Sequence, residues 1–148
     1  MSIQSVALGS DHAGVELKSR LADELRKMGY EVRDEGPHNT ERVDYPDYAA
    51  RVSRLVSSGE VDSGVLVCGT GIGMSIAANK IEGIRAALIH DHFTAQMARE
   101  HNNANILIMG ARLLAPEHAI DCMKVWIKGD FEARHQARLD KITQLERD

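Results

Sequence analysis

Cysteine is scarce in this sequence, and long apolar runs and an excess of basic residues are missing. The 148 residues include two cysteines, Cys68 and Cys122, which are too few and too far apart for a disulfide framework. No apolar run approaches the roughly 20 residues that a membrane-spanning helix requires. The 18 lysines and arginines are outnumbered by 22 acidic residues, and the net charge of −4 argues against nucleic acid as the main partner. We therefore expect neither a membrane protein nor a nucleic-acid-binding protein.

A secretory leader is also not recognisable in the first residues. Met1 to Gln4 lead directly into an apolar run, without a basic segment or a small-residue cleavage site, so we expect a cytoplasmic protein. Apolar residues make up 43% and charged residues 27%, a composition that disfavours disorder. The length corresponds to one domain over residues 1–148, which can bury roughly two-thirds of its unfolded surface.

Short β-rich runs alternate with helical patterns along the whole chain. The expected strands are residues 6–9, 31–34, 65–68, 86–89 and 106–110. Apolar residues at helical spacing predict helices over residues 17–28, 48–56, 73–80, 93–100 and 120–127, with a last one over 139–145. Between the second strand and the second helix, residues 36–46 form a polar, turn-rich stretch that we interpret as a loop.

This alternation predicts parallel strands joined by right-handed crossovers. The expected fold is α/β: a Rossmann-like, doubly wound, five-stranded parallel sheet in three α/β/α layers, with an extra C-terminal helix. Ligands of such folds bind at the carboxyl ends of the strands. Those ends correspond to residues 9–14, 68–73, 90–92 and 110–112.

The segment Cys68-Gly-Thr-Gly-Ile-Gly73 is the sharpest feature of the sequence. Glycines after a strand let the backbone approach a ligand, and the start of the following helix offers free N–H groups to an anion. The same N–H groups would lower the pKa of Cys68 from about 8.5 and make its thiolate a competent general base. Alternatively, Cys68 is a small buried residue at the end of a strand, and the glycines only turn the chain.

Two familiar motifs are incomplete at this loop. A dinucleotide-binding fingerprint requires glycine at position 74, and a cysteine phosphatase loop requires arginine there, whereas the sequence has Met74. The P-loop pattern is not found elsewhere in the chain.

Two histidine-containing segments have both a structural and a functional interpretation. Asp11 is suited to cap the first helix, but Asp11 and His12 at the end of a strand also suit the binding of sugar hydroxyls or phosphate. His101 and Asn102 follow a helix, where both residue types are common for purely structural reasons.

The remaining histidines and arginines include candidates for a metal site and for a phosphate site. His90 and His92 would share a face of an extended strand, but no third ligand at a recognisable spacing supports a metal site, so we expect none. Arg134 and Arg138 share a helix face, and Arg112 follows the fifth strand. A solvated surface is the default for such arginines, although a nearby glycine-rich loop makes a phosphate site more plausible.

Several motifs in order along residues 3–145 resemble the type B ribose-5-phosphate isomerases, within the wider ribose/galactose isomerase family. They are Gly9-Ser-Asp-His-Ala-Gly14, Asp44-Tyr-Pro46, Cys68-Gly-Thr-Gly-Ile-Gly73, Ala77-Ala-Asn-Lys80, Gly83-Ile-Arg-Ala86, His101-Asn102, Gly110-Ala-Arg112 and Arg134-His-Gln-Ala-Arg138. The resemblance implies interconversion of ribose 5-phosphate and ribulose 5-phosphate, a step of pentose phosphate metabolism, with neither metal nor cofactor.

The resemblance also implies a role for each matching residue. Cys68 would be the base that moves the proton, and Thr70 with the N–H groups of Gly69, Gly71, Ile72 and Gly73 would stabilise the enediolate. His101 would open the furanose ring. The remaining residues would bind the substrate: the sugar at Asp11, His12 and Asn102, and the phosphate at Arg112, Arg134 and Arg138.

In this family the site lies at the interface of a homodimer, possibly within a tetramer, and the partner contributes the segment from His101 to Arg112. Residues 129–133 are one residue shorter than the commoner pattern, which affects the placement of Arg134. The residues His90-Asp91-His92 also depart from many members and could reshape the pocket for another sugar phosphate.

Two alternatives remain open from the sequence. The same chemistry could act on allose 6-phosphate, galactose 6-phosphate or a tetrulose 4-phosphate. A non-catalytic module that binds phosphate or a nucleotide would also use the glycine loop and the arginines, but it would leave Cys68 and His101 without a role.

Overall fold

Five parallel strands form the sheet at the centre of the computed structural model, which describes residues 2–148. The strands lie in the order β2-β1-β3-β5-β4. Their bounds are β1 Ser5–Ser10, β2 Glu31–Asp34, β3 Ser63–Cys68, β4 Ala86–Leu88 and β5 Ile106–Gly110. The predicted five-stranded parallel sheet is confirmed.

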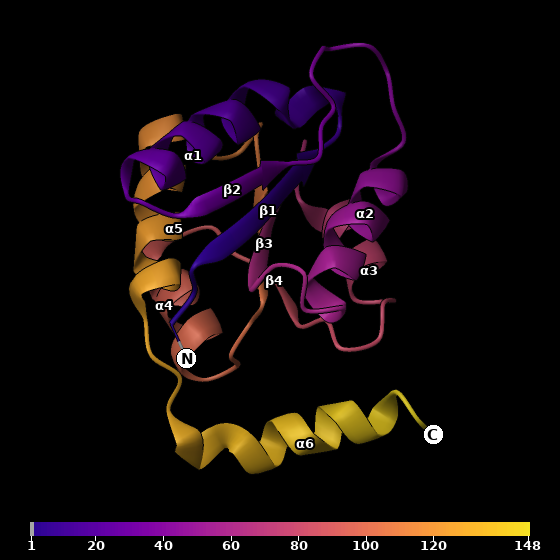
Figure 1. Ribbon diagram of the computed structural model, residues 1–148, viewed down its shortest axis with the longest axis vertical. Helices are drawn as coiled ribbons and strands as arrows, with labels where there is room; N and C mark the ends of the chain where they lie inside the picture. Colours follow the sequence, from indigo (N-terminus) through magenta and orange to yellow (C-terminus); the bar gives the residue numbers. More distant parts are fainter. Residues whose placement is uncertain (1) are drawn as a thin grey trace.

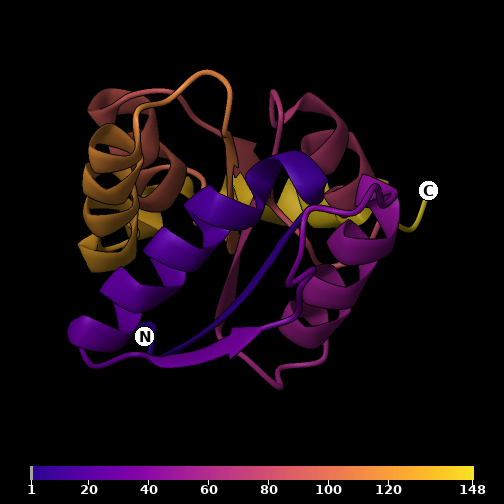
Figure 2. The ribbon, with the colours of Figure 1, turned by 90° about the horizontal axis from the view of Figure 1, so that it is seen from above.

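Helices cover both faces of this sheet and complete the expected three layers (Figures 1 and 2). Their bounds are α1 Val15–Lys27, α2 Tyr45–Ser57, α3 Ile72–Ala78, α4 His92–Glu100, α5 Pro116–Lys128 and α6 Gln136–Leu145. Helices α1, α4 and α5 pack on one face, and α2 and α3 pack on the other. Two single 3₁₀ turns, His12–Gly14 and Ala133–His135, precede α1 and α6.

A separate apolar core lies on each face of the sheet. The α1/α4/α5 side buries Leu21, Met123 and Trp126, whose indole N–H donates to the Ala104 carbonyl at 3.1 Å. On the α2/α3 side the core includes Met74. All residues of β3 and β5 are buried, as expected for central strands covered on both faces.

Two local expectations were wrong. The loop expected over residues 36–46 ends earlier, because α2 begins at Tyr45 and places Pro46 in its first turn, where a missing N–H is not needed. The expected fourth strand is also shorter. Asp91 instead caps α4, with its carboxylate accepting from the Thr94 N–H at 2.7 Å, so His90 and His92 do not share a strand face.

The strand order reverses between β1 and β3, and this reversal locates the ligand crevice of a doubly wound sheet. From β1 the chain passes to β2 on one side, whereas β3 lies on the other side. The crevice of such folds lies beyond the carboxyl ends of the strands at this point. Here those ends carry Asp11 and Cys68, and the Asp11 N–H donates to the Val67 carbonyl at 3.1 Å.

The expected extra helix, α6, crosses below the amino ends of the strands (Figure 1). Leu139 is its buried residue, whereas Ile142 and Leu145 are exposed. Near its end, the Glu146 carboxylate accepts from the Gly83 N–H at 3.1 and 3.2 Å. Within residues 2–148, none of the helices combines the length and the apolar character needed to cross a membrane.

Lys18 is a buried charge that the sequence analysis did not identify. Its side chain is 1% exposed, and its ammonium group lies 2.7 Å from the Asp34 carboxylate and 2.7 Å from the Pro37 carbonyl. The same Asp34 oxygen accepts from the Gly36 N–H at 2.9 Å. This network fixes the end of β2 and the following loop against α1.

We expect Lys18→Met to lower the free energy of unfolding by about 3 kcal/mol, because it leaves Asp34 largely buried without its cation. Arg20→Met is the matched control on the same helix, since Arg20 pairs with Glu117 in solvent. Arg20→Met should lower the free energy of unfolding by less than about 1 kcal/mol. Urea denaturation of both variants measures the difference, and equal midpoints would contradict a structural role for the buried pair.

Candidate active site

A cleft of about 420 Å³ opens at the carboxyl ends of β1, β3 and β5. It is therefore located at the point where the strand order reverses. The residues lining it are Asp11, Tyr45, Cys68, Gly69, Thr70, Ile72, Gly73, Ile76 and Arg112. Seven of the residues predicted from the sequence are thus close together in one chain: Asp11, Cys68, Gly69, Thr70, Ile72, Gly73 and Arg112.

Cys68 is the last residue of β3, and its thiol is buried at the base of this cleft. The Gly71 N–H donates to the sulfur, with 3.2 Å between nitrogen and Sγ. A hydrogen bond donated to sulfur stabilises negative charge there. Cys68 therefore combines the two features of the sequence interpretations, since it is buried and it also faces an N–H donor.

Close packing requires glycine at two positions of the loop after β3. Gly71 has φ of 81°, and a Cβ atom there would lie 2.5 Å from the Leu88 side chain. At Gly73, a Cβ atom would lie 2.5 Å from the ring of Tyr45. The backbone can therefore turn from β3 into α3 within three residues and keep its N–H groups near Cys68.

Some of the N–H groups predicted to face a substrate are already engaged within the loop. The Gly71 N–H donates to Cys68, and the Ile72 N–H donates to the hydroxyl oxygen of Thr70 at 3.2 Å. Thr70 is itself exposed, so its hydroxyl keeps access to the cleft that it lines.

Asp11 has the capping role that its sequence context favoured. One of its carboxylate oxygens accepts from the N–H groups of Ala13 at 2.9 Å and Gly14 at 3.2 Å. The adjacent His12 accepts at Nδ1 from the Val43 N–H at 3.3 Å, which places the proton of a neutral ring on Nε2. Both side chains are thus held by the backbone at the end of β1.

Arg112 lines the cleft that contains Cys68 of the same chain. Its peptide N–H donates to the Gly69 carbonyl at 3.0 Å. Its guanidinium group packs so closely on Gly69 that a Cβ atom there would lie 3.2 Å from Nη1. This position corrects the expectation that Arg112 comes across the interface with His101, because the turn after β5 returns it beside the end of β3.

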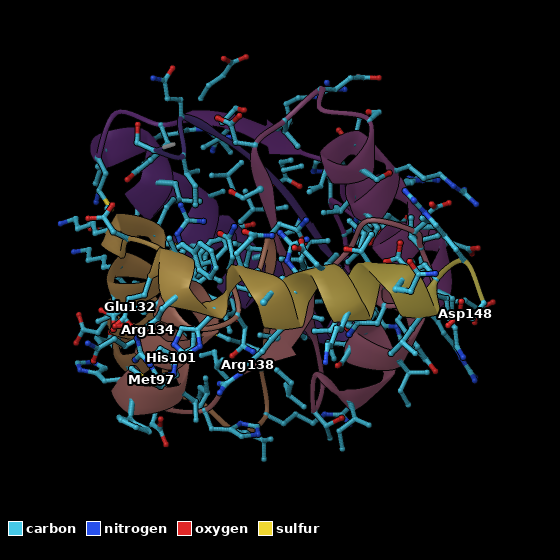
Figure 3. The ribbon with its side chains drawn as sticks, turned by 90° about the horizontal axis from the view of Figure 1, so that it is seen from below. Met97, His101, Glu132, Arg134, Arg138 and Asp148 are labelled. Atoms are coloured by element: carbon cyan, nitrogen blue, oxygen red, sulfur yellow. The ribbon has the colours of Figure 1, made fainter. Side chains whose placement is uncertain are left out.

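Four other predicted residues lie near the amino ends of the strands, away from the cleft at the carboxyl ends. Helix α4 begins near the carboxyl end of β4 and runs back toward the amino ends of the strands. It therefore places His101 next to α6, which carries Arg138, with Arg134 in the turn just before it (Figure 3). Asn102, the next residue after His101, lines a hollow together with Ile142 of α6. A single chain does not bring these four residues to Cys68.

His101 belongs to a cluster of charged side chains near those strand ends. Its Nε2 lies 3.5 Å from the Glu132 carboxylate, which also contacts the Arg134 guanidinium at 3.3 Å. Its ring lies 4.3 Å, centroid to centroid, from the ring of His135, whose Nδ1 is 3.4 Å from the Arg138 guanidinium. The cluster therefore brings two histidines and two arginines together near one carboxylate.

His135 is a member of this cluster that the sequence analysis left without a role. It is buried, and its Nε2 has no hydrogen-bond partner among residues 2–148. Burial, followed by the charge of Arg134 and the proximity of His101, lowers the pKa of His135. A neutral imidazole beneath His101 adds no further positive charge. In the sequence, the only indication of a role for His135 is its position between Arg134 and Arg138.

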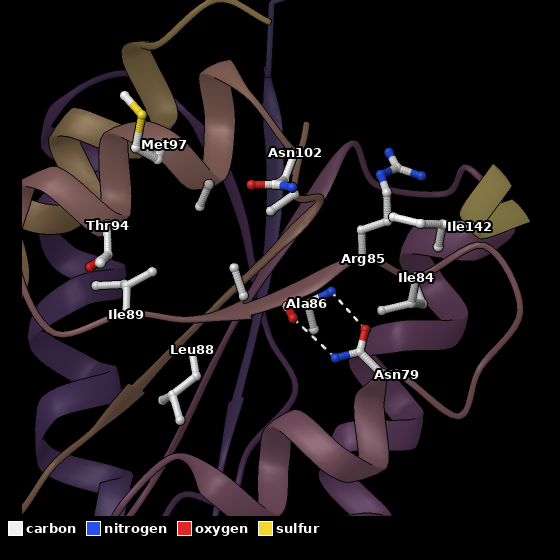
Figure 4. A pocket seen from close by; sticks show the side chains of 13 residues that line it. Asn79, Ile84, Arg85, Ala86, Leu88, Ile89, Thr94, Met97, Asn102 and Ile142 are labelled. Carbon is white, nitrogen blue, oxygen red and sulfur yellow. Dashed lines mark hydrogen bonds between the residues drawn. The ribbon is translucent and has the colours of Figure 1, made fainter. Parts of the chain in front are cut away.

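Asn102 lines a different hollow, of about 440 Å³, along the edge strand β4 (Figure 4). Asn79 also lines this hollow, and its side chain donates to the Ala86 carbonyl at 3.0 Å and accepts from the Ala86 N–H at 2.9 Å. These bonds occupy backbone groups of an edge strand that has no neighbouring strand there. Ile142 of α6 also lines the hollow.

Two groups of side chains within residues 2–148 have ligand atoms close enough to hold a metal ion. One consists of His101, Glu132 and His135, and the other of His92, His118 and Cys122. Neither group includes a residue of the cleft around Cys68.

Comparison with known proteins identifies the relatives of this chain. Residues 6–142 match the family model described as Ribose/Galactose Isomerase. The chain is 43% identical to ribose-5-phosphate isomerase B of Escherichia coli, over 97% of each chain. It is 41% identical to D-erythrulose-4-phosphate isomerase of Pectobacterium atrosepticum, over 96% of this chain and 95% of that one.

The solved structure of Clostridium thermocellum ribose-5-phosphate isomerase B superimposes with a TM-score of 0.95 at 48% identity, over 97% of this chain and 98% of that chain. The family match covers nearly the whole fold, including the loop after β3 and the turn before α6. This chain therefore belongs to the ribose/galactose isomerase family.

Proposed function

We propose that the protein, as one domain over residues 1–148, is an aldose–ketose isomerase that interconverts ribose 5-phosphate and ribulose 5-phosphate without a metal or cofactor. This proposal rests on one observation: the Cys68 sulfur accepts a hydrogen bond from the Gly71 N–H, at 3.2 Å, in a cleft where the strand order of the sheet reverses. Membership of the family supports the same reaction class.

The reaction requires a base beside donors aimed at a developing oxyanion. In our proposal the Cys68 thiolate removes the proton from C2 of the open-chain aldose, which forms an enediolate. Return of that proton to C1, with transfer of the hydroxyl proton from O2 to O1, gives the ketose. The exposed Thr70 hydroxyl stabilises the negative oxygen, together with N–H groups of the glycine loop other than those of Gly71 and Ile72, which donate to Cys68 and Thr70.

Asp11 and His12 bind sugar hydroxyls beside Cys68 in this proposal, with the Nε2–H of His12 as a donor. Arg112 is close enough to Gly69 to hold the substrate over the loop. Phosphate binding by Arg112, Arg134 and Arg138 provides binding energy remote from the reacting carbons and positions them over the thiolate. His101 acts as acid and base in ring opening, and Asn102 holds the sugar.

These roles require a homodimer, because His101, Asn102, Arg134 and Arg138 lie at the opposite edge of the sheet from Cys68. A two-fold axis can bring the α4–α6 edge of one chain to the cleft of the other and create two equivalent sites. Apolar side chains that are more than half exposed support this interface: Ile72 and Ile76 line the cleft, Leu113 follows Arg112, and Phe93 lies in the first turn of α4.

We also propose that the protein works in the cytoplasm. Both cysteines are free thiols, and a base such as Cys68 remains active only where it is kept reduced.

Other sugar phosphates remain candidates for the same site, because one relative is an isomerase of a four-carbon sugar phosphate. The base, the donors and the phosphate-binding arginines would be unchanged, and only the length of the carbon chain between them would differ. Relative kcat/KM values for four-, five- and six-carbon aldose phosphates identify the preferred substrate.

Cys68→Ala should lower kcat for ribose 5-phosphate by about 100- to 10,000-fold, the contribution expected of a positioned general base. Cys122→Ala removes the other thiol and is the matched control; with both proteins treated with a chelator, its turnover should be close to wild type. Circular dichroism shows whether each variant is folded. A folded Cys68→Ala variant with normal turnover would exclude Cys68 as the base, and binding of the substrate without any turnover by the wild type would favour a non-catalytic module.

Arg138→Ala should raise KM by about 10- to 100-fold, because a charge-assisted hydrogen bond to phosphate contributes roughly 1.5–3 kcal/mol. Lys141→Ala, on the same helix and outside the histidine cluster, should leave KM near the wild-type value. Steady-state kinetics with ribose 5-phosphate distinguishes the two. If both substitutions change KM equally, the effect reflects the general charge of α6 rather than a phosphate site.

Co-expression of Cys68→Ala and His101→Gln chains should restore activity that neither variant has alone. Random pairing makes half of the dimers mixed, and one site of each mixed dimer combines an intact Cys68 with an intact His101. Roughly a quarter of the wild-type sites is therefore expected. Activity no greater than the sum of the two separate variants would show that the site does not use residues from both chains.

A further inference from the structure

Three side chains with metal-binding atoms meet between α4 and α5, away from the cleft around Cys68. They are His92, His118 and Cys122, and their ligand atoms all lie within 4.8 Å of one another. His92 is the first residue of α4, and the other two belong to α5. None of the three has a role in the proposed isomerase reaction.

The secondary structure explains why these residues converge. His118 and Cys122 are four residues apart on α5, so they lie on the same face of the helix. Helix α5 packs against α4, and that face meets the beginning of α4. The rings of His92 and His118 stack with 5.8 Å between centroids and an angle of 4° between their planes.

The spacing of the donor atoms matches that of a tetrahedral zinc site. The distance from Cys122 Sγ to His118 Nε2 is 3.6 Å. With Zn–S near 2.3 Å and Zn–N near 2.0–2.1 Å, a tetrahedral ion separates its sulfur and nitrogen ligands by about 3.5 Å. The donor atoms of His118 and Cys122 therefore already have the separation that one ion requires, and His92 completes a third bond when its ring turns out of the parallel stack on His118.

The surroundings of the cluster favour a cation. The His90 carbonyl oxygen lies 2.8 Å from His118 Nε2 and places a partial negative charge beside the site, and coordination of the ion through Nε2 replaces this hydrogen bond. The Asp91 carboxylate, next to His92 in the sequence, is held in place by the Thr94 N–H at 2.7 Å and adds a negative charge beside the cluster. Binding of the ion displaces the proton of the Cys122 thiol.

We propose that His92, His118 and Cys122 bind Zn²⁺ through two imidazole nitrogens and one thiolate sulfur. This ligand set suits zinc, and three protein ligands leave the fourth position to water. The exposed side chain of His92 forms the outer wall of the site, from which the ion enters, whereas Cys122 forms its buried floor.

Zinc at this position would cross-link the start of α4 to α5. Helix α4 ends at Glu100, directly before His101, so the ion would fix the orientation of the helix that presents His101 to the partner chain. The role is structural, and no step of the isomerase reaction passes through the metal.

Cobalt substitution tests the ligand set directly. Chelator-treated protein titrated with Co²⁺ should develop a thiolate-to-cobalt charge-transfer band that saturates at one ion per chain and disappears on addition of Zn²⁺. Cys122→Ser should abolish the band, and His92→Gln should weaken or abolish it. Cys68→Ser and His101→Gln should retain it, because those residues belong to the proposed active site rather than to this cluster.

Thermal unfolding gives a second readout that is independent of activity. With Zn²⁺ at about 100 times its Kd, the Tm of the wild type should rise by roughly 5–10 °C. His92→Gln should keep the metal-free Tm, because its side chain is exposed, and should lose most of the rise. His90→Gln is the matched control, an exposed histidine two residues away that should keep the full rise.

The proposal is overturned if Co²⁺ produces no thiolate band, or if the band depends on Cys68 and persists in Cys122→Ser. It is also overturned if His92→Gln and His90→Gln reduce the zinc-dependent rise in Tm equally. That result would indicate non-specific binding to surface histidines.

Discussion

The turn from β3 into α3 is the constraint on which the rest of the site depends. Cys68 ends a fully buried strand, and only three residues separate it from the first residue of α3. Only glycine fits at positions 71 and 73, because Leu88 and Tyr45 occupy the space of any Cβ atom. The same packing directs the Gly71 N–H onto the Cys68 sulfur. Close packing, which requires glycine in this turn, thus also places an N–H donor on the sulfur, where it can stabilise the negative charge of a thiolate.

Strand polarity explains why four residues of the candidate site are far from the cleft in one chain. In a parallel sheet every crossover helix returns from the carboxyl edge to the amino edge. Residues at strand ends, such as Cys68 and Arg112, therefore gather at one edge, and residues at helix ends, such as His101, gather at the other. A two-fold arrangement of chains reconciles these positions with a shared site, which fits the exposed apolar residues at the cleft edge.

Features with a local cause were predictable from the sequence. The five strands follow from short apolar runs, and the capping role of Asp11 follows from its position before a helix. Features that depend on distant partners were not. Lys18 looks like a solvated lysine until Asp34 is seen beside it, and His135 becomes notable only when α6 buries it against His101. Arg112 was expected to come from the partner, because the sequence does not show that the turn after β5 returns it to Gly69.

The cluster of His92, His118 and Cys122 illustrates the same limit. No spacing rule joins a residue at the start of α4 to two residues on α5, since their proximity depends on how the helices pack. Helix α4 has nine residues and is about 13.5 Å long, so it connects this cluster at one edge of the sheet to His101 at the other. An α-helix transmits its orientation with little bending over two to three turns. The packing of α4 on α5 therefore sets where His101 points, and in a dimer it would also set the distance between His101 and the partner's Cys68.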